Sequence, residues 1–272
     1  MTDTGRDRSP DRTDPPLAGT IWSAWSTLRL AMMAVLWCAA NLVAQTLTYT
    51  YTGDMFAAVG AGGLLVIALA GLVVKGQGGT LARDFDLDRP LPGTALLAIL
   101  ASVAALLPTS YLAGLSSAIH PPTAEWLAFY NEHLPDTAPR VAVAVAAVVV
   151  CGPVAEELVF RGLVYRIGRR HWGVLPSALI SALIFGLAHG EPWYFFGLVG
   201  LGLLYAHIYE RTGSLTACIL AHAAHNGMSL AIMLSQDSAS GDGLADLPID
   251  WFGLAGSLFA LIAIIFLYSR RR

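Results

Sequence analysis

The sequence has few charged residues. Asp, Glu, Lys and Arg make up only 13% of the 272 residues, about half the share of roughly 25% that soluble domains carry. Hydrophobic residues make up 56%, and the mean hydropathy is +0.60. The formal net charge of −3 gives no sign of the basic surface that binds nucleic acid. These values exclude an ordinary soluble protein and indicate a polytopic membrane protein, with a length that suits one compact helical domain.

Several other features are scarce or absent. The three cysteines, Cys38, Cys151 and Cys218, are unevenly spaced in apolar stretches, which argues against a disulfide framework. There is no Gly-x-Ser-x-Gly or His-Glu-x-x-His motif and no convincing Cys–His pairing, which weakens serine, cysteine and zincin-type mechanisms. No internal repeat supports an inverted-repeat transporter. The first apolar stretch comes too late and is too long for an ordinary signal peptide.

Eight apolar stretches are long enough to cross a bilayer as helices. They cover approximately 27–48, 55–75, 93–115, 139–160, 174–190, 193–210, 213–234 and 251–268. We therefore expect an all-α fold, a polytopic membrane bundle of about eight transmembrane helices. Residues 1–20 are rich in Asp, Arg, Thr, Pro and Gly and are predicted to be a disordered tail, whereas residues 21–272 are predicted to form a single integral-membrane domain.

The loops between these stretches alternate in charge. One set carries the basic residues Lys75, Arg83, Arg89, Arg166, Arg169, Arg170, Arg211, Arg270, Arg271 and Arg272. The other set is acidic, with Arg140 as its single basic residue. By the positive-inside rule both termini are cytoplasmic, as an even number of spans requires. The segment Thr123–Leu134 is predicted to form a short helix on the outer surface.

Two adjacent carboxylates, Glu156 and Glu157, lie inside the fourth apolar stretch, where ionisable groups are costly and become functional candidates. Glu157 and Arg161 are four residues apart with the acid first, which predicts an ion pair on one helix face. Glu156 points about 100° away, toward apolar neighbours, and is the candidate general base or acid. Gly152-Pro153 predicts a bend beside them. The alternative is a structural ion pair next to a snorkelling acid.

His189, His222 and Asn226 lie in the fifth and seventh stretches, and their predicted depths match that of the acids. Measured from a turn near Trp172, Glu156 lies about 25 Å along one helix and His189 about 24 Å along the next. His222 and Asn226 share a helix face, roughly 14–20 Å from the following turn on the same side. These four side chains are therefore expected to lie at a similar level of the bundle.

This set of groups suits the activation of water. A carboxylate and an imidazole, Glu156 and His189, can bind a water molecule and take its proton. His222 and Asn226 can donate hydrogen bonds to a developing oxyanion, and His225 could replace His222 if the helix is rotated by one residue. Two other interpretations stay open, which are interhelical hydrogen bonding without catalysis and a proton relay in a transporter.

Three motifs occur in order on successive membrane helices: Glu-Glu-x-x-x-Arg from Glu156, Phe-x-x-x-His from Phe185 and His-x-x-x-Asn from His222. Together they resemble the CPBP family, also called the Abi family, which comprises CaaX prenyl endopeptidases and bacteriocin-processing or bacteriocin-immunity proteins. The resemblance covers about 141–230, whereas the flanking stretches are similar only in being apolar.

The resemblance implies an intramembrane glutamic endopeptidase, a hydrolase that needs no metal, with its catalytic core at 139–234. The implied roles are water activation by Glu156 with help from His189, completion of the first motif by Glu157 and Arg161, and an oxyanion site formed by His222 and Asn226. The expected partners are a peptide or membrane-protein substrate and the lipid bilayer. The Ala-, Gly- and Arg-rich composition suits a bacterial cell membrane, where a prenylated substrate is not expected. The alternatives are a zinc-dependent protease, with Glu156, His189 and His222 as ligands, and a non-enzymatic immunity or scaffold protein.

Overall fold

The computed structural model describes residues 19–235 and 250–270. The predicted disordered tail at 1–20 therefore lies almost entirely outside the described residues, as do most of the acidic residues of the last loop. Every regular element in the two described ranges is helical, which confirms the predicted all-α class.

The elements follow one another closely along the chain. In order they are η1 (Ile21–Ala24), α1 (Thr27–Thr52), α2 (Met55–Gly76), α3 (Leu81–Asp84), α4 (Pro92–Ala104), α5 (Leu106–Ile119), α6 (Ala124–Glu132), α7 (Ala138–Ala144), η2 (Val145–Cys151), α8 (Gly152–Val159), η3 (Phe160–Tyr165), α9 (Arg166–His171), α10 (Val174–Ala188), η4 (Pro192–Tyr194), α11 (Phe195–Thr212), α12 (Leu215–Ser235) and α13 (Trp251–Arg270).

Six helical segments of the described chain are long and apolar enough to cross a membrane, at 27–52, 55–76, 92–119, 138–171, 215–235 and 251–268. The segment 138–171 joins α7, η2, α8, η3 and α9 into one helix of 34 residues. Helices also occupy the two other predicted stretches, but α10 has only 15 residues and α11 has 18. The polytopic helical bundle is confirmed, and the count of eight spans stays a prediction.

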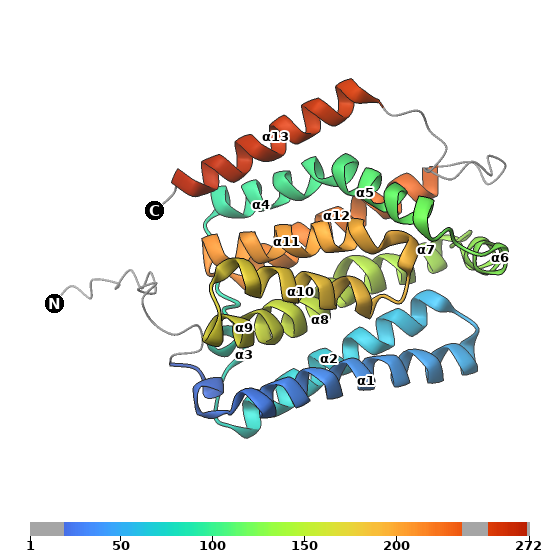
Figure 1. The fold of residues 1–272 in the computed structure, drawn as a ribbon. Coiled ribbons are helices and arrows are strands. Elements are labelled where there is room, and N and C mark those ends of the chain that lie inside the picture. The colour runs from blue at the N-terminus through green and yellow to red at the C-terminus, as the bar shows by residue number, and fades with distance from the viewer. Residues whose placement is uncertain (1–18, 236–249, 271–272) are drawn as a thin grey trace.

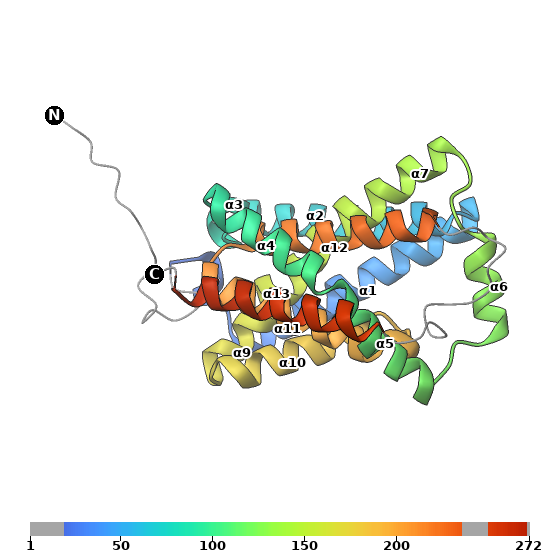
Figure 2. The same cartoon turned by 90° about the horizontal axis from the view of Figure 1, so that it is seen from above.

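The long helices lie side by side, with the α1–α2 hairpin along one edge of the bundle and α13 along the other (Figure 1). The beginning of α1 and the end of α13 lie at the same end of the bundle, and α6 crosses the opposite end (Figures 1 and 2). The short helix predicted within Thr123–Leu134 is therefore present as α6. Which end of the bundle is cytoplasmic stays a prediction from the loop charges.

Local signals in the sequence explain the hairpin at that edge. Gly53 ends α1 with a φ of 66°, a left-handed conformation that glycine adopts without steric cost. The next residue, Asp54, begins α2, because its side chain accepts a hydrogen bond of 2.9 Å from the backbone amide of Ala57. These two adjacent residues reverse the chain with no further loop.

At Gly152-Pro153, where the sequence predicts a bend, a π-helical segment meets an α-helical one. Pro153 has no backbone N–H to donate, and the π-helical segment η2 runs directly up to this pair. A second π-helical segment, η3, follows α8. The helix α2 approaches η2 closely at Gly63, where an added Cβ would lie only 2.9 Å from the carbonyl oxygen of Cys151. The two carboxylates therefore lie on a short α-helical piece between two widened turns.

A buried polar network closes the end of the bundle where α1 begins. The Asp84 carboxylate accepts hydrogen bonds from the backbone amides of Ile21 (3.0 Å) and Thr80 (2.8 Å) and from the Arg83 guanidinium (3.0 Å). Burial by itself raises the pKa of Asp84, but the Arg83 guanidinium and the two amides outweigh it and hold this pKa below its ordinary value. The ionised carboxylate therefore fastens η1 to the loop after α2.

Arg166 continues this network into the bundle. Its side chain is fully buried, and it donates hydrogen bonds to the backbone carbonyl of Asp84 (2.8 Å), to the hydroxyl of Tyr209 (2.6 Å) and to the carboxylate of Asp86. Arg166 was counted above among the basic loop residues, but it lies inside the 34-residue helix and is paired within the protein. Its charge therefore adds less to the exposed basic surface of that end than the sequence suggests.

Acid is expected to weaken this end of the bundle through Asp84. Because the pKa of Asp84 is lower in the folded protein, its contribution to the free energy of unfolding is fully present above the ordinary value of 3.8 and is lost as the pH falls through the folded pKa. We expect the midpoint of thermal unfolding of the wild type to fall more steeply below pH 3.8 than that of Asp84→Asn. Equal slopes for the two proteins in that window would contradict the assignment.

Candidate active site

The first group of the site is the ion pair that the sequence predicted. Arg161 donates to Glu157 over 3.0 Å, and both side chains are completely buried. Arg161 also donates to the backbone carbonyl of Gly202 in α11 over 3.0 Å. The same Glu157 oxygen lies 2.9 Å from Nδ1 of His222 in α12. Glu157 therefore joins three helical segments and has its charge compensated from two sides.

Aromatic rings complete the environment of Arg161. Its guanidinium lies 4.8 Å from the ring centre of Phe185 and 5.2 Å from that of Tyr205. The Tyr205 ring also stacks on the His222 imidazole, with ring centres 4.7 Å apart. Cation–π contacts of this kind stabilise a guanidinium that has been removed from water. Sequence reasoning missed Tyr205, because no motif includes it; the available signal was an aromatic residue with a polar end inside an apolar stretch.

Glu156 faces the two histidines whose depth the sequence predicted. One of its oxygens, Oε2, lies 3.6 Å from Nε2 of His222 and 3.8 Å from Nε2 of His189. The Glu156 side chain is 30% exposed, in contrast to the fully buried Glu157. Across the bundle Glu156 therefore faces imidazole rings, rather than the apolar side chains that neighbour it along its own helix. The prediction that Glu156, His189 and His222 lie at a similar level of the bundle is confirmed, because residues from three different helices meet at this oxygen.

Each histidine is oriented by a hydrogen bond at its other ring nitrogen. Nδ1 of His189 lies 2.8 Å from the carbonyl oxygen of Phe185, one turn back in α10, and a carbonyl can only accept. Nδ1 of His222 lies 2.9 Å from the Glu157 carboxylate. These partners assign the proton to Nδ1 in both neutral rings, so that each Nε2 is directed at Glu156 as an acceptor.

Asn226 lies one turn farther along α12 and has a different partner. Its side-chain amide donates to the backbone carbonyl of Val148 in η2 over 2.8 Å. His225 is buried, with Nδ1 3.3 Å from the carbonyl oxygen of Ser102 in α4. His222, rather than His225, is therefore the histidine of α12 that faces the acids. The structure thus brings Glu156, Glu157, Arg161, His189 and His222 together, whereas the side chain of Asn226 is bonded to the π-helical segment η2.

The described residues contain no group of three or more His, Cys, Asp or Glu side chains arranged to hold a metal ion. The zinc site considered above would use Glu156, His189 and His222. At these three residues, one carboxylate oxygen of Glu156 lies opposite two imidazole nitrogens, at distances of 3.6 and 3.8 Å.

Two curated bacterial proteins are similar to part of this chain. A Bacillus subtilis (strain 168) protein named "Putative membrane peptidase YdiL" is 27% identical over 85 residues, which is 31% of this chain and 35% of that protein. A Staphylococcus aureus (strain USA300) protein named "Membrane-embedded CAAX protease MroQ" is 29% identical over 119 residues, which is 40% of this chain and 47% of that protein. The chain thus spans less than half the length of either relative, and no solved structure matches it.

The family comparison falls on the part of the chain that builds the site. The matched segment begins with α7 and ends within α12, and it contains all six predicted site residues. Residues 138–228 match the model of the family described as Type II CAAX prenyl endopeptidase Rce1-like, and this part of the chain is therefore similar to that family.

Proposed function

We propose that the protein is an intramembrane endopeptidase that hydrolyses a peptide bond with water activated by Glu156 and His189. One observation carries this proposal. Oε2 of Glu156, on a side chain that is 30% exposed, faces two imidazole nitrogens, while Oε1 of the neighbouring Glu157 is bonded to both Arg161 and His222. Two adjacent acids in different environments can take different roles, one as base and one as a fixed counter-charge.

The distances suit a water molecule held between the groups. Separations of 3.6 and 3.8 Å from Glu156 to the two Nε2 atoms are too long for direct hydrogen bonds, and a bridging water can satisfy both partners. Such a water would donate one hydrogen to Glu156 and the other to Nε2 of His189. As its oxygen attacks the peptide carbonyl carbon, Glu156 takes the proton and later returns it to the departing amine nitrogen.

His222 is suited to the oxyanion role in its doubly protonated form. Its neutral ring, protonated at Nδ1, has no hydrogen on Nε2 to donate. Donation from Nε2 requires a second proton on the ring, whose two nitrogens lie 3.6 Å from a Glu156 oxygen and 2.9 Å from a Glu157 oxygen. The charge that develops on the substrate oxygen would then meet an imidazolium. Asn226, the second predicted donor, would exchange its bond to the Val148 carbonyl for the substrate oxygen.

The comparisons support the reaction class rather than the substrate. The Rce1-like match includes every residue used above, and one relative is named a membrane-embedded CAAX protease. For this chain we propose a peptide or membrane-protein substrate and a location in a bacterial cell membrane. We further propose cytoplasmic termini, supported by the loop charges and by the position of the beginning of α1 and the end of α13 at one end of the bundle (Figure 1).

The direct test is cleavage of a proteome-derived peptide library by the detergent-purified protein, read out as new peptide termini by mass spectrometry. We expect the wild type to produce new termini that the Glu156→Gln variant does not produce. A library left intact by folded wild type would move the assignment to the immunity or scaffold role.

Chelation separates this mechanism from the zinc alternative. Because the proposed base is a carboxylate and no step uses a metal, we expect 1,10-phenanthroline to leave the initial cleavage rate unchanged. Cleavage that is lost to the chelator and restored by added Zn²⁺ would overturn the glutamate mechanism and favour a site built from Glu156, His189 and His222.

A further inference from the structure

The role proposed for His222 depends on the orientation of its ring plane. Nδ1 lies 2.9 Å from an oxygen of Glu157, and Nε2 lies 3.6 Å from an oxygen of Glu156. The hydrogen bond at Nδ1 fixes that nitrogen but leaves the ring free to tilt about the bond. Because Nε2 lies on the other side of the ring, a tilt would move it relative to Glu156 and to a substrate oxygen. The ring plane therefore needs a second support.

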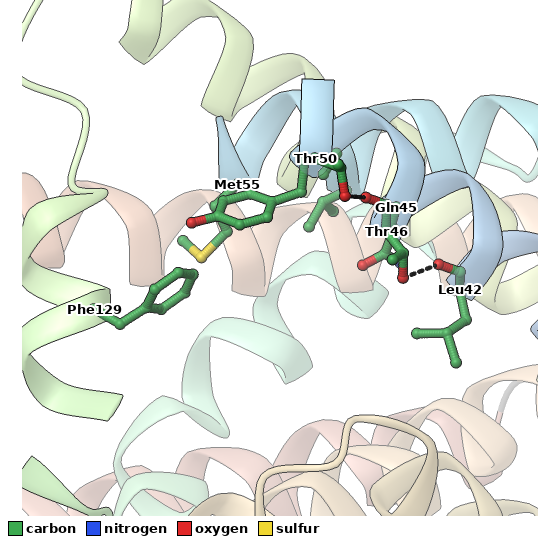
Figure 3. Close-up of a pocket in the computed structure, with 9 residues that line it drawn as sticks. Leu42, Gln45, Thr46, Thr50, Met55 and Phe129 are labelled. Carbon is green, nitrogen blue, oxygen red and sulfur yellow. Dashed lines mark hydrogen bonds between the residues drawn. The ribbon is translucent and has the colours of Figure 1, made fainter. Parts of the chain in front are cut away.

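The groove between α1, α2 and α6 does not provide this support. It shares no residue with the site, because its lining consists of Leu42, Gln45, Thr46, Tyr49, Thr50, Met55, Ala58, Val59 and Phe129 (Figure 3). The His222 side chain, in contrast, is only 4% exposed. The contacts that hold its ring therefore lie inside the bundle.

Two aromatic rings contact His222, in different ways. The Tyr205 ring stacks on the imidazole, with ring centres 4.7 Å apart and planes inclined by only 24°. The Phe185 ring meets it edge-on, at 5.9 Å and 72°. Stacked and edge-to-face contacts are both favourable, but only a stacked ring lies along the plane of its partner and opposes a tilt. Tyr205 is therefore the residue that supports the ring plane.

Tyr205 itself has a fixed place beside His222. Its side chain is completely buried, and the guanidinium of Arg161 lies 5.2 Å from its ring centre. The backbone is held as well, because the thiol of Cys218 in α12 donates to the Tyr205 carbonyl over 3.4 Å. Cys218 and His222 are four residues apart and share a helix face. The helices α11 and α12 are thus joined one turn from the stacked rings.

The hydroxyl of Tyr205 is separate from these contacts. It is buried and forms no hydrogen bond with any described residue, the nearby Ser102 hydroxyl included. A buried donor without a partner is unfavourable, whereas the contacts with His222 and Arg161 are made by the ring. Phenylalanine would provide the same ring without the hydroxyl, so the two parts of the side chain can be tested separately.

We propose that Tyr205 is a positioning residue, whose ring face keeps Nε2 of His222 directed at Glu156 and at the substrate oxygen. Tyr205 acts through His222 and does not touch the reacting atoms. This inference rests on the proposed function, since the oxyanion role of His222 is part of it. Misplacing a catalytic group by about 1 Å can lower the rate by about 10²-fold. Loss of the ring should therefore act on kcat rather than on KM.

The first measurement follows the His222 ring without any substrate. The full-length protein, labelled with ¹³C at histidine Cε1, is studied by NMR in detergent micelles, and the His222 signal is assigned by its loss in His222→Gln. We expect one signal with a high order parameter in the wild type and in Tyr205→Phe. Tyr205→Leu keeps an apolar side chain but has no flat face, and we expect it to split this signal or lower its order parameter.

The second measurement is cleavage by the same variants of a peptide identified from the library. We expect Tyr205→Leu to lower kcat by about 10–100-fold while KM changes by less than about threefold, and Tyr205→Phe to restore kcat to within about twofold of the wild type. Ile208→Ala is the matched control, because Ile208 is equally buried and lies one turn farther along α11. It should leave the His222 signal and kcat nearly unchanged.

Three results would overturn the role of Tyr205. An equal loss of kcat in Tyr205→Phe would assign the effect to the hydroxyl, an equal effect of Ile208→Ala would indicate general loosening of α11, and an unchanged His222 signal in Tyr205→Leu would show that the ring needs no support. If Tyr205→Leu fails to fold, Tyr205→Met, which fills the space with a flexible side chain, is measured in its place. A His222 signal that responds as expected, in a wild type that cleaves no peptide, would support the contact and overturn the protease assignment.

Discussion

Replacing Glu156 by Gln is expected to lower kcat for peptide cleavage by about 10²–10⁴-fold, the range that general-base catalysis contributes. The amide has nearly the same shape as the carboxylate but cannot take a proton from water. Because Glu156 makes no direct hydrogen bond through Oε2 within the described residues, its replacement leaves no new buried charge. The fold should therefore survive, and initial rates on a peptide identified from the library measure the effect.

A suitable control is Glu191→Gln. Glu191 follows α10 two residues after His189, outside the long helices, and burial raises its pKa, which the nearby His189 imidazole opposes in part. Its replacement removes one negative charge from the same neighbourhood without touching the proposed base. We expect a change of less than about tenfold, as for an electrostatic neighbour rather than a proton acceptor. Wild-type cleavage by Glu156→Gln, or an equal loss in both variants, would contradict the assigned role.

The part of the site that the sequence predicted depends on helix geometry alone. The spacing of Glu157 and Arg161 requires only that the chain be helical, and the structure pairs them at 3.0 Å. The level of Glu156, His189 and His222 requires only the rise per residue and the position of the turns. Such relations survive the local widening of the helix at η2 and η3, because a π-turn shifts a residue by only a fraction of a turn.

What the sequence did not predict depends on contacts between helices. Nothing local indicates that Tyr205 stacks on His222 or that the carbonyl of Gly202 accepts from Arg161. The bond from Asn226 to Val148 likewise requires two helices in a defined rotation. Arg166 is a further example, at the end of the bundle. Its sequence position predicts an exposed loop charge, but the fold buries its side chain against Asp86.

Removing the guanidinium of Arg161 is expected to produce the largest loss of stability. Arg161→Met leaves Glu157 fully buried, with His222 as its remaining partner in place of two. Breaking a buried ion pair from one side typically costs about 3–5 kcal/mol, because the remaining charge stays desolvated. The two ring contacts and the bond to the Gly202 carbonyl are lost as well. The free energy of unfolding can be measured by SDS titration in mixed micelles with tryptophan fluorescence as the signal.

Arg169→Met provides the matched control, because it removes the same side chain from an ion pair at the edge of the bundle. Arg169 and Glu210 lie 3.0 Å apart and are 22% and 26% exposed, so solvent screens their interaction and we expect a loss of about 1 kcal/mol or less. The double variant Glu157→Leu/Arg161→Met should recover part of the loss seen in Arg161→Met, since it leaves no unpaired carboxylate. If Arg161→Met were no less stable than Arg169→Met, the ion pair between Glu157 and Arg161 would contribute no more to stability than an exposed pair. The compensated charge of Glu157 could then no longer explain why Glu156 alone serves as the base.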